Sequence, residues 1–541
     1  MPEFVFSGDE AIGRGALDAG VSGAFAYPGT PSTEIMEFIQ DNLDAYLVAL
    51  PEADRKTVVA QWCSNEKTAY EAALGASFAG RRAMVSMKHV GLNVAMDPFT
   101  NSALVRIKGG LVVVVADDPG MHSSQDEQDS RMLADFAKVP CFEPSDQQEA
   151  YAMTRAAFDY SEAHEVPVLL RVTTRLAHAR APVRTMAARG TNALEKCADF
   201  KSWILMPANA RKNWKALLEK NLRFRADAEN AAAINLRDKS LGVITCGLGL
   251  RYYLENEDDW ATAHDGARPS HLHIGRYPIG GDKIRELAAH VEKILVIEEG
   301  QTFIEKQIVG VFPAPLPVAG KLSGDLPLEG ELSSDSVRAA LGLAQKATLP
   351  SAGIVIPTRP PQFCQGCPHA DSFAALKEAL KDEAEFLIAS DIGCYTLAAL
   401  PPFNAVDSCV EMGASIGMAR GASSVGLKKA VATIGDSTFY HSGMTNLLDA
   451  VAHKTTLTVL ILDNSTTGMT GAQPTISPGS RLRAILEGLG VERGHVRELE
   501  AHRKNHEANV AAIREELDYD GVSVIILRRE CIEYLKKARR S

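Results

Sequence analysis

The chain has 541 residues, 46% of them hydrophobic and 6% aromatic, so it is long enough to bury several cores and to form three or four domains. A net charge of -11 excludes the basic surface that nucleic-acid-binding proteins use. The first residues, MPEFVFSGDEA, have neither the basic nor the apolar part of a signal peptide, and the longest apolar runs are too short to cross a bilayer. We therefore expect a cytoplasmic protein that binds neither nucleic acid nor membrane.

Short apolar runs alternate with helical patterns over residues 1–180, which predicts a domain built on a parallel sheet. Thr30 lies in the turn YPGTPSTEI, at the end of one predicted strand. Glu66 opens an alanine-rich helix in the segment CSNEKTAYEAALGA. The helix dipole alone favours a glutamate in a first turn, and Glu71 is a competing candidate for any chemistry assigned to this helix.

The composition of the sequence changes several times after this first domain. Residues 181–238 carry many charges on predicted helices and are expected to form a solvated helical connector. Residues 239–312 open with an apolar strand and predict a further α/β domain. Residues 313–361 are rich in proline and polar residues, which predicts a linker with one helix near residues 335–345. A last α/β domain takes residues 362–541.

In the last domain, two apolar runs end in polar residues that suit a metal ion and a phosphate group. One run ends at Gly435 and Asp436, a helix is predicted over residues 443–453, and the next run ends at Asn464. The carboxyl ends of parallel strands meet at one edge of a sheet, where ligands bind. Asp436 and the side-chain oxygen of Asn464 suit Mg²⁺, and the carbonyl of Thr466 could be a third ligand. The groups expected to face a diphosphate are backbone N–H groups at the helix start and the side chains of Ser437 and Thr438.

The combined spacing favours a binding site over two ordinary turns. GDS, then about 25 residues, then DN resembles the magnesium and diphosphate motif of thiamine diphosphate enzymes, with Ser437 for its third glycine and Asp463 for its first asparagine. The upstream segment MGASIGMA resembles the helix start that precedes this motif. Further cofactor contacts implied by the resemblance come from Met412, Gly413 and Gly435. Thiamine diphosphate also needs a glutamate beside N1′ of its aminopyrimidine, and NEK before an alanine-rich helix assigns that role to Glu66.

The cysteines form a second constellation. Nine cysteines, an odd number in a chain expected in the cytoplasm, argue against a disulfide framework. Cys364 and Cys367 form a CxxC motif just before the last domain, which by itself fits zinc, a redox dithiol or an iron-sulfur cluster equally well. Cys409 is interpreted as a small buried residue.

Several uncommon motifs, in order along nearly the whole chain, resemble the alpha subunit of indolepyruvate ferredoxin oxidoreductase: YPGTPSTEI, MKHVGLNVAMDP, GGLVVVVADDPGMHSSQDEQDSR, PVLLRVTTRLAH and LVIEEGQTFIEKQ. The resemblance implies an α/β fold with two thiamine diphosphate-binding-fold domains, each a parallel sheet with helices on both faces. These are a pyrimidine-type domain in residues 1–180 and a diphosphate-type domain in residues 362–541, with a transketolase C-terminal-like domain in residues 239–312. The resemblance also implies a 4Fe-4S cluster held by Cys364, Cys367, Cys394 and Cys531.

The family implies oxidative decarboxylation of a 2-oxoacid, such as indolepyruvate, to an acyl-CoA and CO2. Thiamine diphosphate, Mg²⁺ and one 4Fe-4S cluster would be the cofactors, and coenzyme A the co-substrate. The implied partners are a small beta subunit and ferredoxin or another electron acceptor, in a dimer of heterodimers. Typical alpha subunits continue into a ferredoxin-like domain with further cysteines, which this sequence lacks. Electrons are therefore expected to leave through a single cluster.

Four polar residues in family-like segments are candidates for the substrate pocket. His89 and His441 are assigned catalytic roles, and together with Asn93 and His122 they are expected to lie in loops. A lone histidine in a loop is more often structural than catalytic. Thr30 could contact the substrate carboxylate or the cofactor, or it could simply belong to a helix start.

Two other functions stay open. A non-oxidative thiamine diphosphate-dependent decarboxylase needs Glu66, Asp436 and Asn464 but none of the cysteines. A non-catalytic assembly subunit would instead use the CxxC motif for structural zinc. Iron and thiamine diphosphate analysis of protein purified without oxygen distinguishes these possibilities.

Overall fold

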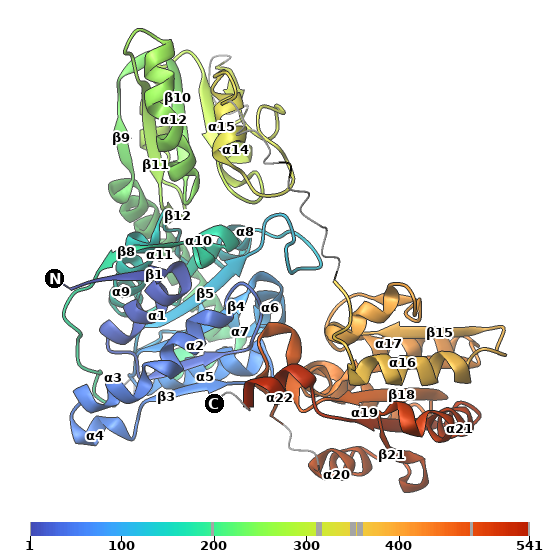
Figure 1. The fold of residues 1–541 in the computed structure, drawn as a ribbon. Coiled ribbons are helices and arrows are strands. Elements are labelled where there is room, and N and C mark those ends of the chain that lie inside the picture. Colours follow the sequence, from blue (N-terminus) through green and yellow to red (C-terminus); the bar gives the residue numbers. More distant parts are fainter. Residues whose placement is uncertain are drawn as a thin grey trace. The chain divides into compact units, whose positions relative to one another are not determined.

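The structure, a computed structural model, describes residues 2–195, 200–309, 316–346, 353, 361–476 and 480–538 (Figure 1). The chain divides into two compact units, Met1–Pro350 and Ser351–Ser541. Each unit has helices packed on largely parallel sheets, so the α/β fold class expected from the sequence is confirmed. Every helix in the described part of the chain is too short or too polar to cross a lipid bilayer.

The first unit contains a seven-stranded sheet in the order β12-β6-β7-β5-β4-β2-β3, whose neighbours are parallel except for the pair β12 and β6. Alternate residues of the central strand β5 enter two different cores, Val113 and Val115 on one face and Val112 and Val114 on the other. Continuous apolar runs are typical of parallel strands covered on both faces. The strands are β2 (Gly23–Ala26), β3 (Val59–Trp62), β4 (Ala83–Lys88), β5 (Leu111–Asp117), β6 (Cys141–Phe142), β7 (Val168–Thr173) and β12 (Arg276–Tyr277).

Helices and a small two-stranded sheet complete this first domain. The small sheet pairs β1 (Glu3–Ser7) antiparallel with β8 (Arg180–Arg184), which joins the two ends of the domain. The helices are α1 (Gly8–Asp18), α2 (Thr33–Asp41), α3 (Leu43–Ala49), α4 (Glu52–Arg55), α5 (Glu66–Phe78), α6 (His89–Val94), α7 (Met96–Ser102), α8 (Ser130–Ala137), α9 (Gln147–His164) and α10 (Thr174–His178).

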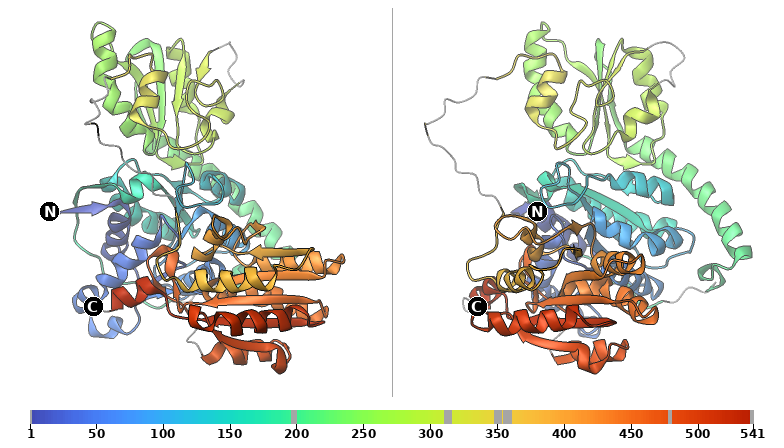
Figure 2. Two further views of the ribbon diagram at one scale, coloured as in Figure 1. Left: turned by 45° about the vertical axis from the view of Figure 1, so that its right-hand side comes forward. Right: turned by 90° about the vertical axis from the view of Figure 1, so that its right-hand side faces the viewer.

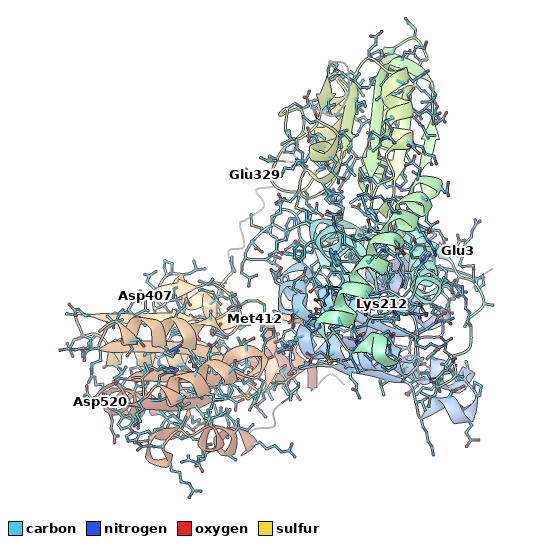
Figure 3. The ribbon with its side chains drawn as sticks, turned by 180° about the vertical axis from the view of Figure 1, so that it is seen from behind. Glu3, Lys212, Glu329, Asp407, Met412 and Asp520 are labelled. Atoms are coloured by element: carbon cyan, nitrogen blue, oxygen red, sulfur yellow. The ribbon has the colours of Figure 1, made fainter. Side chains whose placement is uncertain are left out.

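The segment expected to be a solvated connector contributes to the core. Its 3-10 turn η1 (Phe200–Trp203) leads into the long helix α11 (Pro207–Ala231), on which Figure 3 labels Lys212. On this helix Leu217 and Phe224 are buried, and the Phe224 ring lies 5.4 Å from that of His164 on α9. The expectation of a solvated connector is therefore wrong for one face of α11, because burial of a few apolar residues outweighs the charges on its other faces.

A five-stranded sheet in the order β14-β13-β10-β11-β9 forms the rest of the first unit, with helices on both sides (Figure 2, right). Its strands are β9 (Ala233–Asn235), β10 (Asp238–Cys246), β11 (Pro269–Ile274), β13 (Ile294–Ile297) and β14 (Val318–Ala319). Its helices are α12 (Gly249–Ala263), α13 (Asp282–His290), α14 (Phe303–Ile308) and α15 (Ser334–Ala340).

The prediction that residues 313–361 form a linker is wrong for much of this segment. Strand β14 extends the five-stranded sheet, and Leu326, Leu332 and Val337 are buried in the same core as Tyr253 of α12. The polar sequence hid this packing, because the few apolar residues that enter the core lie far apart in it. The other part of the predicted linker, residues 313–315, 347–352 and 354–360, lies outside the described residues.

Two fully buried arginines join the domains of the first unit. Arg171 on β7 donates to Asp117 (2.6 Å) and to the carbonyl of Glu299 (3.1 Å). Arg131 on α8 binds Asp129 (2.5 Å) and donates to the same Glu299 carbonyl (2.9 Å). Since Glu299 follows β13, both guanidinium groups hold the edge of the five-stranded domain against the seven-stranded sheet. Removing either charge would leave the neighbouring buried carboxylates with too little positive charge to balance them.

The second unit is a parallel six-stranded sheet in the order β16-β15-β17-β18-β22-β21. Its strands are β15 (Phe386–Ser390), β16 (Ser408–Cys409), β17 (Lys429–Gly435), β18 (Leu457–Asp463), β21 (Val496–Glu500) and β22 (Val522–Arg528). Its helices are α16 (Pro368–Ala379), α17 (Ala414–Ser424), α18 (Asp436–Thr438), α19 (Met444–Ala452), α20 (Ser480–Gly488), α21 (His506–Leu517) and α22 (Ile532–Ala538). Shorter elements are the 3-10 turns η2 (Cys394–Ala399), η4 (Gly468–Thr470), η5 (Arg493–His495) and η6 (Arg503–Asn505), the π turn η3 (Phe439–Gly443), and the hairpin of β19 (Thr466–Thr467) and β20 (Gln473–Pro474).

The buried arginine pair gives a prediction about stability. Replacing Arg171 by Met should lower the free energy of unfolding of the first unit by about 3–5 kcal/mol, because Asp117 would lose its buried arginine partner and Glu143 the closer of its two. The four tryptophans all lie before residue 261, so tryptophan fluorescence during urea unfolding reports on this unit. The control is Arg189→Met, which removes a half-exposed pair with Asp159 and should cost no more than about 1 kcal/mol. Equal unfolding midpoints for the two variants would contradict the role given to Arg171.

Candidate active site

In the first unit, three candidate residues follow three neighbouring strands of the seven-stranded sheet. Thr30 lies in the loop after β2, Glu66 is the first residue of α5 after β3, and His89 is the first residue of α6 after β4. The strands pair in parallel in the order β4-β2-β3. All three residues therefore lie at the carboxyl edge of one sheet, where ligands of such sheets bind.

Glu66 is almost fully buried, with 5% of its surface exposed. Its carboxyl group packs on the backbone of Gly91 in α6, so closely that a Cβ atom there would lie 2.6 Å from Oε1 of Glu66. Asn65 caps α5 by accepting a hydrogen bond from the backbone N–H of Thr68 (2.8 Å). Cap and packing together fix the Glu66 carboxyl group at the start of the helix.

The expectation that the candidate histidines and Asn93 lie in loops is wrong for most of them. His89 and Asn93 belong to α6, and His441 belongs to the π turn between α18 and α19; His122 does lie in a loop, where it pairs with Glu331 (3.2 Å). His89 is buried, and its Nε2 lies 3.2 Å from the carbonyl oxygen of Asp126. Its Nδ1 has no hydrogen-bond partner among the residues described.

Lys88, at the end of β4, is a site residue that the sequence analysis missed. It is 9% exposed, its Nζ donates to the carbonyl of Ser123 (2.6 Å), and its stem packs against Gly29. Burial lowers the pKa of Lys88, while the negative charges of Asp118, Asp126 and Glu66 oppose this. Lys88 could have been noticed in the sequence, because it lies at a strand end directly before His89.

In the second unit, four neighbouring strand ends carry four candidate residues. In the sheet order β15-β17-β18-β22, Cys394 follows the first strand, Asp436 the second, Asn464 the third and Cys531 the fourth. The two predicted metal ligands thus follow the central two of these strands. Two of the predicted cluster ligands follow the strands on either side.

Asp436 is the residue at this edge that most needs a cation. It is 3% exposed, and its Oδ2 has no hydrogen-bond partner among the described residues. Burial raises the pKa of Asp436 to about 8, and the negative charge of Asp463 adds to this effect. The carboxylate of Asp463 is itself neutralised by Arg528, whose Nε donates to it (2.8 Å). A divalent cation would compensate Asp436 in the same way.

The predicted helix over residues 443–453 starts earlier than expected, and that boundary is wrong. Helical structure begins at Asp436, passes through the π turn and continues to Ala452. Ser437 and Thr438 therefore lie in a first helical turn, whose N–H groups have no partners within the helix and can bind an anion. Ser442 and Gly443 resemble a helix start in sequence, which masked a π turn of the kind often found at functional sites.

The side chain of Asn464 is held in one orientation. Its Oδ1 accepts from the N–H of Thr466 (3.1 Å), and its Nδ2 donates to Nε2 of His369 (3.1 Å). Burial, with the nearby charge of Arg529, lowers the pKa of His369 to about 4, so the ring is neutral near pH 7 and can accept. His369 was missed in the sequence, although it directly follows the CxxC motif and a proline.

The glycines of the candidate cofactor site are places of close approach. Gly413 has φ +95°, and a Cβ atom on it would lie 2.4 Å from that of Ser442. Asp391, also missed in the sequence, accepts from the N–H groups of Gly413 (2.5 Å) and Ser415 (3.2 Å) and so fixes the start of α17 beside Met412. A Cβ on Gly435 would meet Tyr395 at 2.7 Å.

The four predicted cluster cysteines lie in one neighbourhood. A Cβ atom on Gly468 would be 3.6 Å from Sγ of Cys394 and 3.8 Å from Sγ of Cys531. Burial raises the pKa of Cys394 to about 12, and the thiols of Cys367, Cys531 and Cys364 add to it. Arg529 ties the CxxC loop to the Cys531 segment by donating to the carbonyl of Gly366 (2.7 Å). Cys409 instead lies 3.5 Å from the Asp391 carbonyl.

Comparisons with known proteins match two families along the chain. Residues 14–209 match the family described as pyruvate flavodoxin/ferredoxin oxidoreductase, thiamine diP-bdg. Residues 391–539 match the family described as thiamine pyrophosphate enzyme, C-terminal TPP binding domain. A solved structure of 2-oxoglutarate:ferredoxin oxidoreductase from Magnetococcus marinus, with 2-oxoglutarate, coenzyme A and succinyl-CoA bound, is similar in fold, with a TM-score of 0.50 and 15% identity over 63% of this chain and 65% of that one.

Curated relatives are similar over almost the full sequence. Indolepyruvate oxidoreductase subunit IorA of Archaeoglobus fulgidus is 36% identical over 98% of this chain and 87% of its own length. The subunit of the same name from Pyrococcus abyssi is 35% identical over 97% of this chain and 85% of its own length. A 2-oxoglutarate synthase subunit KorA from Methanothermobacter thermautotrophicus is 24% identical over 60% of this chain and 95% of its own length.

Fold and family matches define the chain as a thiamine diphosphate enzyme of the 2-oxoacid ferredoxin oxidoreductase class. Within that class, it belongs to the family of indolepyruvate oxidoreductase subunit IorA.

The buried carboxylate of Asp436 gives a prediction about stability: the difference between Asp436→Asn and the wild type should have opposite signs without and with cofactor. Without cofactor, Asp436→Asn should be more stable than the wild type, and the difference should grow from about pH 4 to about pH 8. The sign follows because the folded wild type holds the proton up to about pH 8, whereas the unfolded chain releases it near pH 4. With Mg²⁺ and thiamine diphosphate, the wild type should become the more stable protein.

Thermal unfolding followed by circular dichroism measures both differences. The control is Asp520→Asn, which changes an exposed carboxylate and should shift stability by less than about 0.5 kcal/mol at every pH. A pH-independent difference between Asp436→Asn and wild type would show that Asp436 is not the unpaired buried acid described above.

Proposed function

We propose that this chain is the catalytic, thiamine diphosphate-binding subunit of an enzyme that converts a 2-oxoacid and coenzyme A to acyl-CoA and CO2. The observation that carries the proposal is the row of four strand ends in the second unit, with Asp436 and Asn464 between Cys394 and Cys531. The names of the relatives support an arylpyruvate such as indolepyruvate as substrate.

Residues of the second unit would hold Mg²⁺ and the diphosphate. Asp436, the side-chain oxygen of Asn464 and the carbonyl of Thr466 are the proposed Mg²⁺ ligands, and the unpaired oxygen of Asp436 supports this choice. The first helical turn would receive the diphosphate oxygens through its N–H groups. Further proposed contacts to the cofactor come from Met412, Gly413, Gly435, Ser437 and Thr438.

Residues of the first unit would work on the organic part of the reaction. Thiamine diphosphate, when bound, supplies the carbon nucleophile and accepts the electrons released with CO2. Glu66 would share a proton with N1′ of the aminopyrimidine, and its burial at the start of α5 supports this role. His89 is proposed to move a proton near the substrate, since its Nδ1 has no partner among the described residues. Thr30 would contact the substrate carboxylate or the cofactor.

His441 is the second histidine proposed for a catalytic role. His441 is buried in the π turn, and its Nδ1 lies 2.5 Å from the Ser442 hydroxyl. Burial raises the pKa of the nearby Glu411, and the positive charge of His441 opposes that shift. We propose that His441 orients this turn beside the cofactor as well as contributing to the pocket.

We propose that Cys364, Cys367, Cys394 and Cys531 bind one 4Fe-4S cluster. A single tetrahedral zinc, with Zn–S bonds of about 2.3 Å, would need its sulfur atoms about 3.8 Å apart. Among the described cysteines, no three sulfur atoms lie within 4.8 Å of one another. This spacing favours the larger frame of a four-iron cluster over the zinc site of an assembly subunit.

Electron transfer completes the proposed reaction. Forming acyl-CoA and CO2 from a 2-oxoacid and coenzyme A releases two electrons and two protons, so an acceptor must take the electrons. The proposed cluster would pass them one at a time to ferredoxin or another acceptor. The relatives are named as subunits, which supports a small beta subunit as partner, and we propose a cytoplasmic dimer of heterodimers.

Exchanging Glu66 for Gln tests the function and the role of this residue together. Activity is measured without oxygen as viologen reduction with a panel of 2-oxoacids and coenzyme A, in the presence of the partner subunit. The wild type should prefer arylpyruvates, and Glu66→Gln should lower kcat about 10²–10⁴-fold while thiamine diphosphate still binds, because proton transfer to the ring is lost.

The matched control for this experiment is Glu71→Gln, on the same helix. Glu71 is half exposed, and its Oε1 lies 3.8 Å from Nζ of Lys67. Because this is a solvent-exposed pair, losing the Glu71 charge should leave kcat near the wild-type value. Full turnover by Glu66→Gln would refute the proton-sharing role. Aldehyde release by the wild type without any viologen reduction would refute the oxidative reaction and favour a non-oxidative decarboxylase.

Exchanging Cys394 for Ser tests the cluster. Wild-type protein purified without oxygen should contain about four iron atoms per chain and show broad visible absorption. Cys394→Ser should lose most of this iron and the viologen reduction, whereas Cys409→Ser, which changes the neighbouring cysteine outside the proposed set, should keep both. Stoichiometric zinc in place of iron in the wild type would contradict the proposed cluster and support the structural role.

A further inference from the structure

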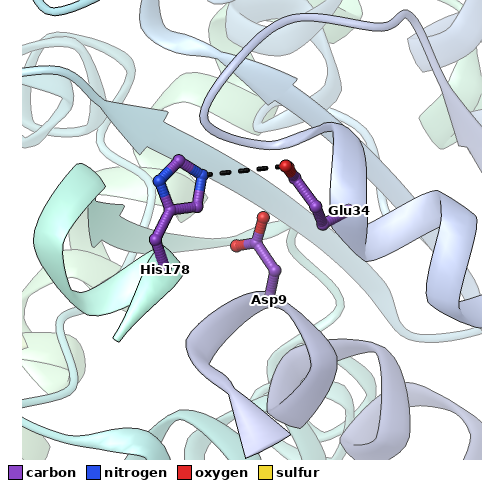
Figure 4. Close-up of side chains that lie close together, drawn as sticks. All are labelled: Asp9, Glu34 and His178. Carbon is purple, nitrogen blue, oxygen red and sulfur yellow. Dashed lines mark ion pairs between the residues drawn. The ribbon is translucent and has the colours of Figure 1, made fainter. Parts of the chain in front are cut away.

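Three ligand-type side chains outside the candidate active site converge in the first unit. Asp9 comes from α1, Glu34 from α2 and His178 from the end of α10, and Figure 4 shows all three facing one another. One ligand atom of each lies within 4.8 Å of the other two. Nε2 of His178 is 3.9 Å from Oε1 of Glu34.

The carboxyl group of Asp9 is buried without compensation. Asp9 is 0% exposed, and neither of its oxygens has a hydrogen-bond partner among the described residues. Oε2 of Glu34 is likewise buried without such a partner. Burial raises the pKa of Asp9 well above its ordinary value, and the charges of Glu34 and Glu10 add to this. Unpaired polar atoms in a protein interior are costly, so this group calls for a positive partner.

The arginines on α1 and α10 are already engaged elsewhere, Arg14 with Asp18 (3.0 Å) and Arg175 with Glu331 (3.0 Å). Arg180 follows α10, and its guanidinium group pairs with the carboxylate of Glu10. Glu10 also accepts from the N–H of Ser7 (2.8 Å) as part of the capping box of α1. Glu10 therefore does not need a further cation, whereas Asp9, one residue before it, points toward Glu34 and His178 (Figure 4).

The elements that carry the three side chains are locked together. A Cβ atom on Gly8 would lie 2.2 Å from the carbonyl oxygen of Leu176, so the start of α1 touches the backbone of α10. A Cβ atom on Gly13 would lie 2.8 Å from the ring of Phe38, so α1 packs equally closely on α2. The three ligand atoms are thus brought together by the core and not by flexible loops.

We propose that Asp9, Glu34 and His178 bind a divalent transition-metal cation. One imidazole and two carboxylates are a donor set that Mn²⁺, Fe²⁺ and Zn²⁺ accept. Bonds of about 2.0–2.2 Å put ligand atoms roughly 3–4 Å apart, a small adjustment from the observed spacing. Glu34 and His178 are about half exposed, so the cation can enter from solvent and water can complete its coordination. The bound cation would neutralise Asp9 and cross-link α1, α2 and α10.

Binding of Mn²⁺ to the full chain, followed by electron paramagnetic resonance, tests this site. Free Mn²⁺ gives a six-line signal that disappears on binding, and electron spin echo modulation detects an imidazole nitrogen bound to the ion. Wild type should bind one more Mn²⁺ per chain than His178→Ala, and only the wild type should show the nitrogen modulation. Glu34→Gln, a change of similar shape at a half-exposed position, should weaken this binding more than about tenfold.

Two further measurements keep the test decisive. His453→Ala removes an exposed histidine that lies 3.3 Å from Asp449, and it should bind as much Mn²⁺ as the wild type. Circular dichroism spectra establish that each variant is folded, and Glu34→Gln carries the test if His178→Ala is not. The proposal would be overturned if wild type, Glu34→Gln and His178→Ala bound equal amounts of Mn²⁺ and none showed nitrogen modulation. Asp9 and Glu34 would then be a pair that shares a proton.

Discussion

The second unit depends on one electrostatic constraint, a carboxylate that is buried at the end of a central strand and has one oxygen without a hydrogen-bond partner among the described residues. Asp436 and Asp463 end neighbouring strands of the same sheet, yet only Asp463 is neutralised by the protein itself, through Arg528. The contrast assigns different roles to two similar groups. Asp463 shapes the turn after β18, whereas Asp436 keeps the capacity to bind a cation. The folded chain thus leaves the negative charge of Asp436 unbalanced, and a bound metal ion with its anionic ligand can balance it.

The loop that carries the proposed metal ligand Asn464 also contacts two of the proposed cluster cysteines. The carbonyl of Asn464 accepts from the N–H of Cys531 (3.1 Å), and a Cβ atom on Gly468 would lie within 4 Å of the side chains of Cys394, Cys531 and Asn464. His369, two residues after Cys367, holds the Asn464 amide. The two proposed sites are therefore joined directly through the backbones of Asn464 and Cys531.

The sequence predicted the α/β fold and the strand ends, because buried parallel strands read as apolar runs that stop at glycine or at a polar residue. The sequence was a poorer guide to segments whose structure depends on a few scattered residues. The linker was wrong because Leu326, Leu332 and Val337 lie far apart in a polar segment. The early helix start was hidden by a π turn. Lys88, Asp391 and His369 were missed because their contacts are with distant residues, and the cofactor roles of the site residues stay predictions.

The buried arginines also set a condition on the order in which the chain can fold during synthesis. Arg131 and the carbonyl of Glu299 that it binds are 168 residues apart in sequence. At roughly 5–20 residues per second, a ribosome needs on the order of ten seconds to supply the second after the first. During that interval the seven-stranded sheet lacks both β12 and the Glu299 carbonyl that receives its two buried guanidinium groups. The nascent first domain is therefore incomplete until the five-stranded domain has been made.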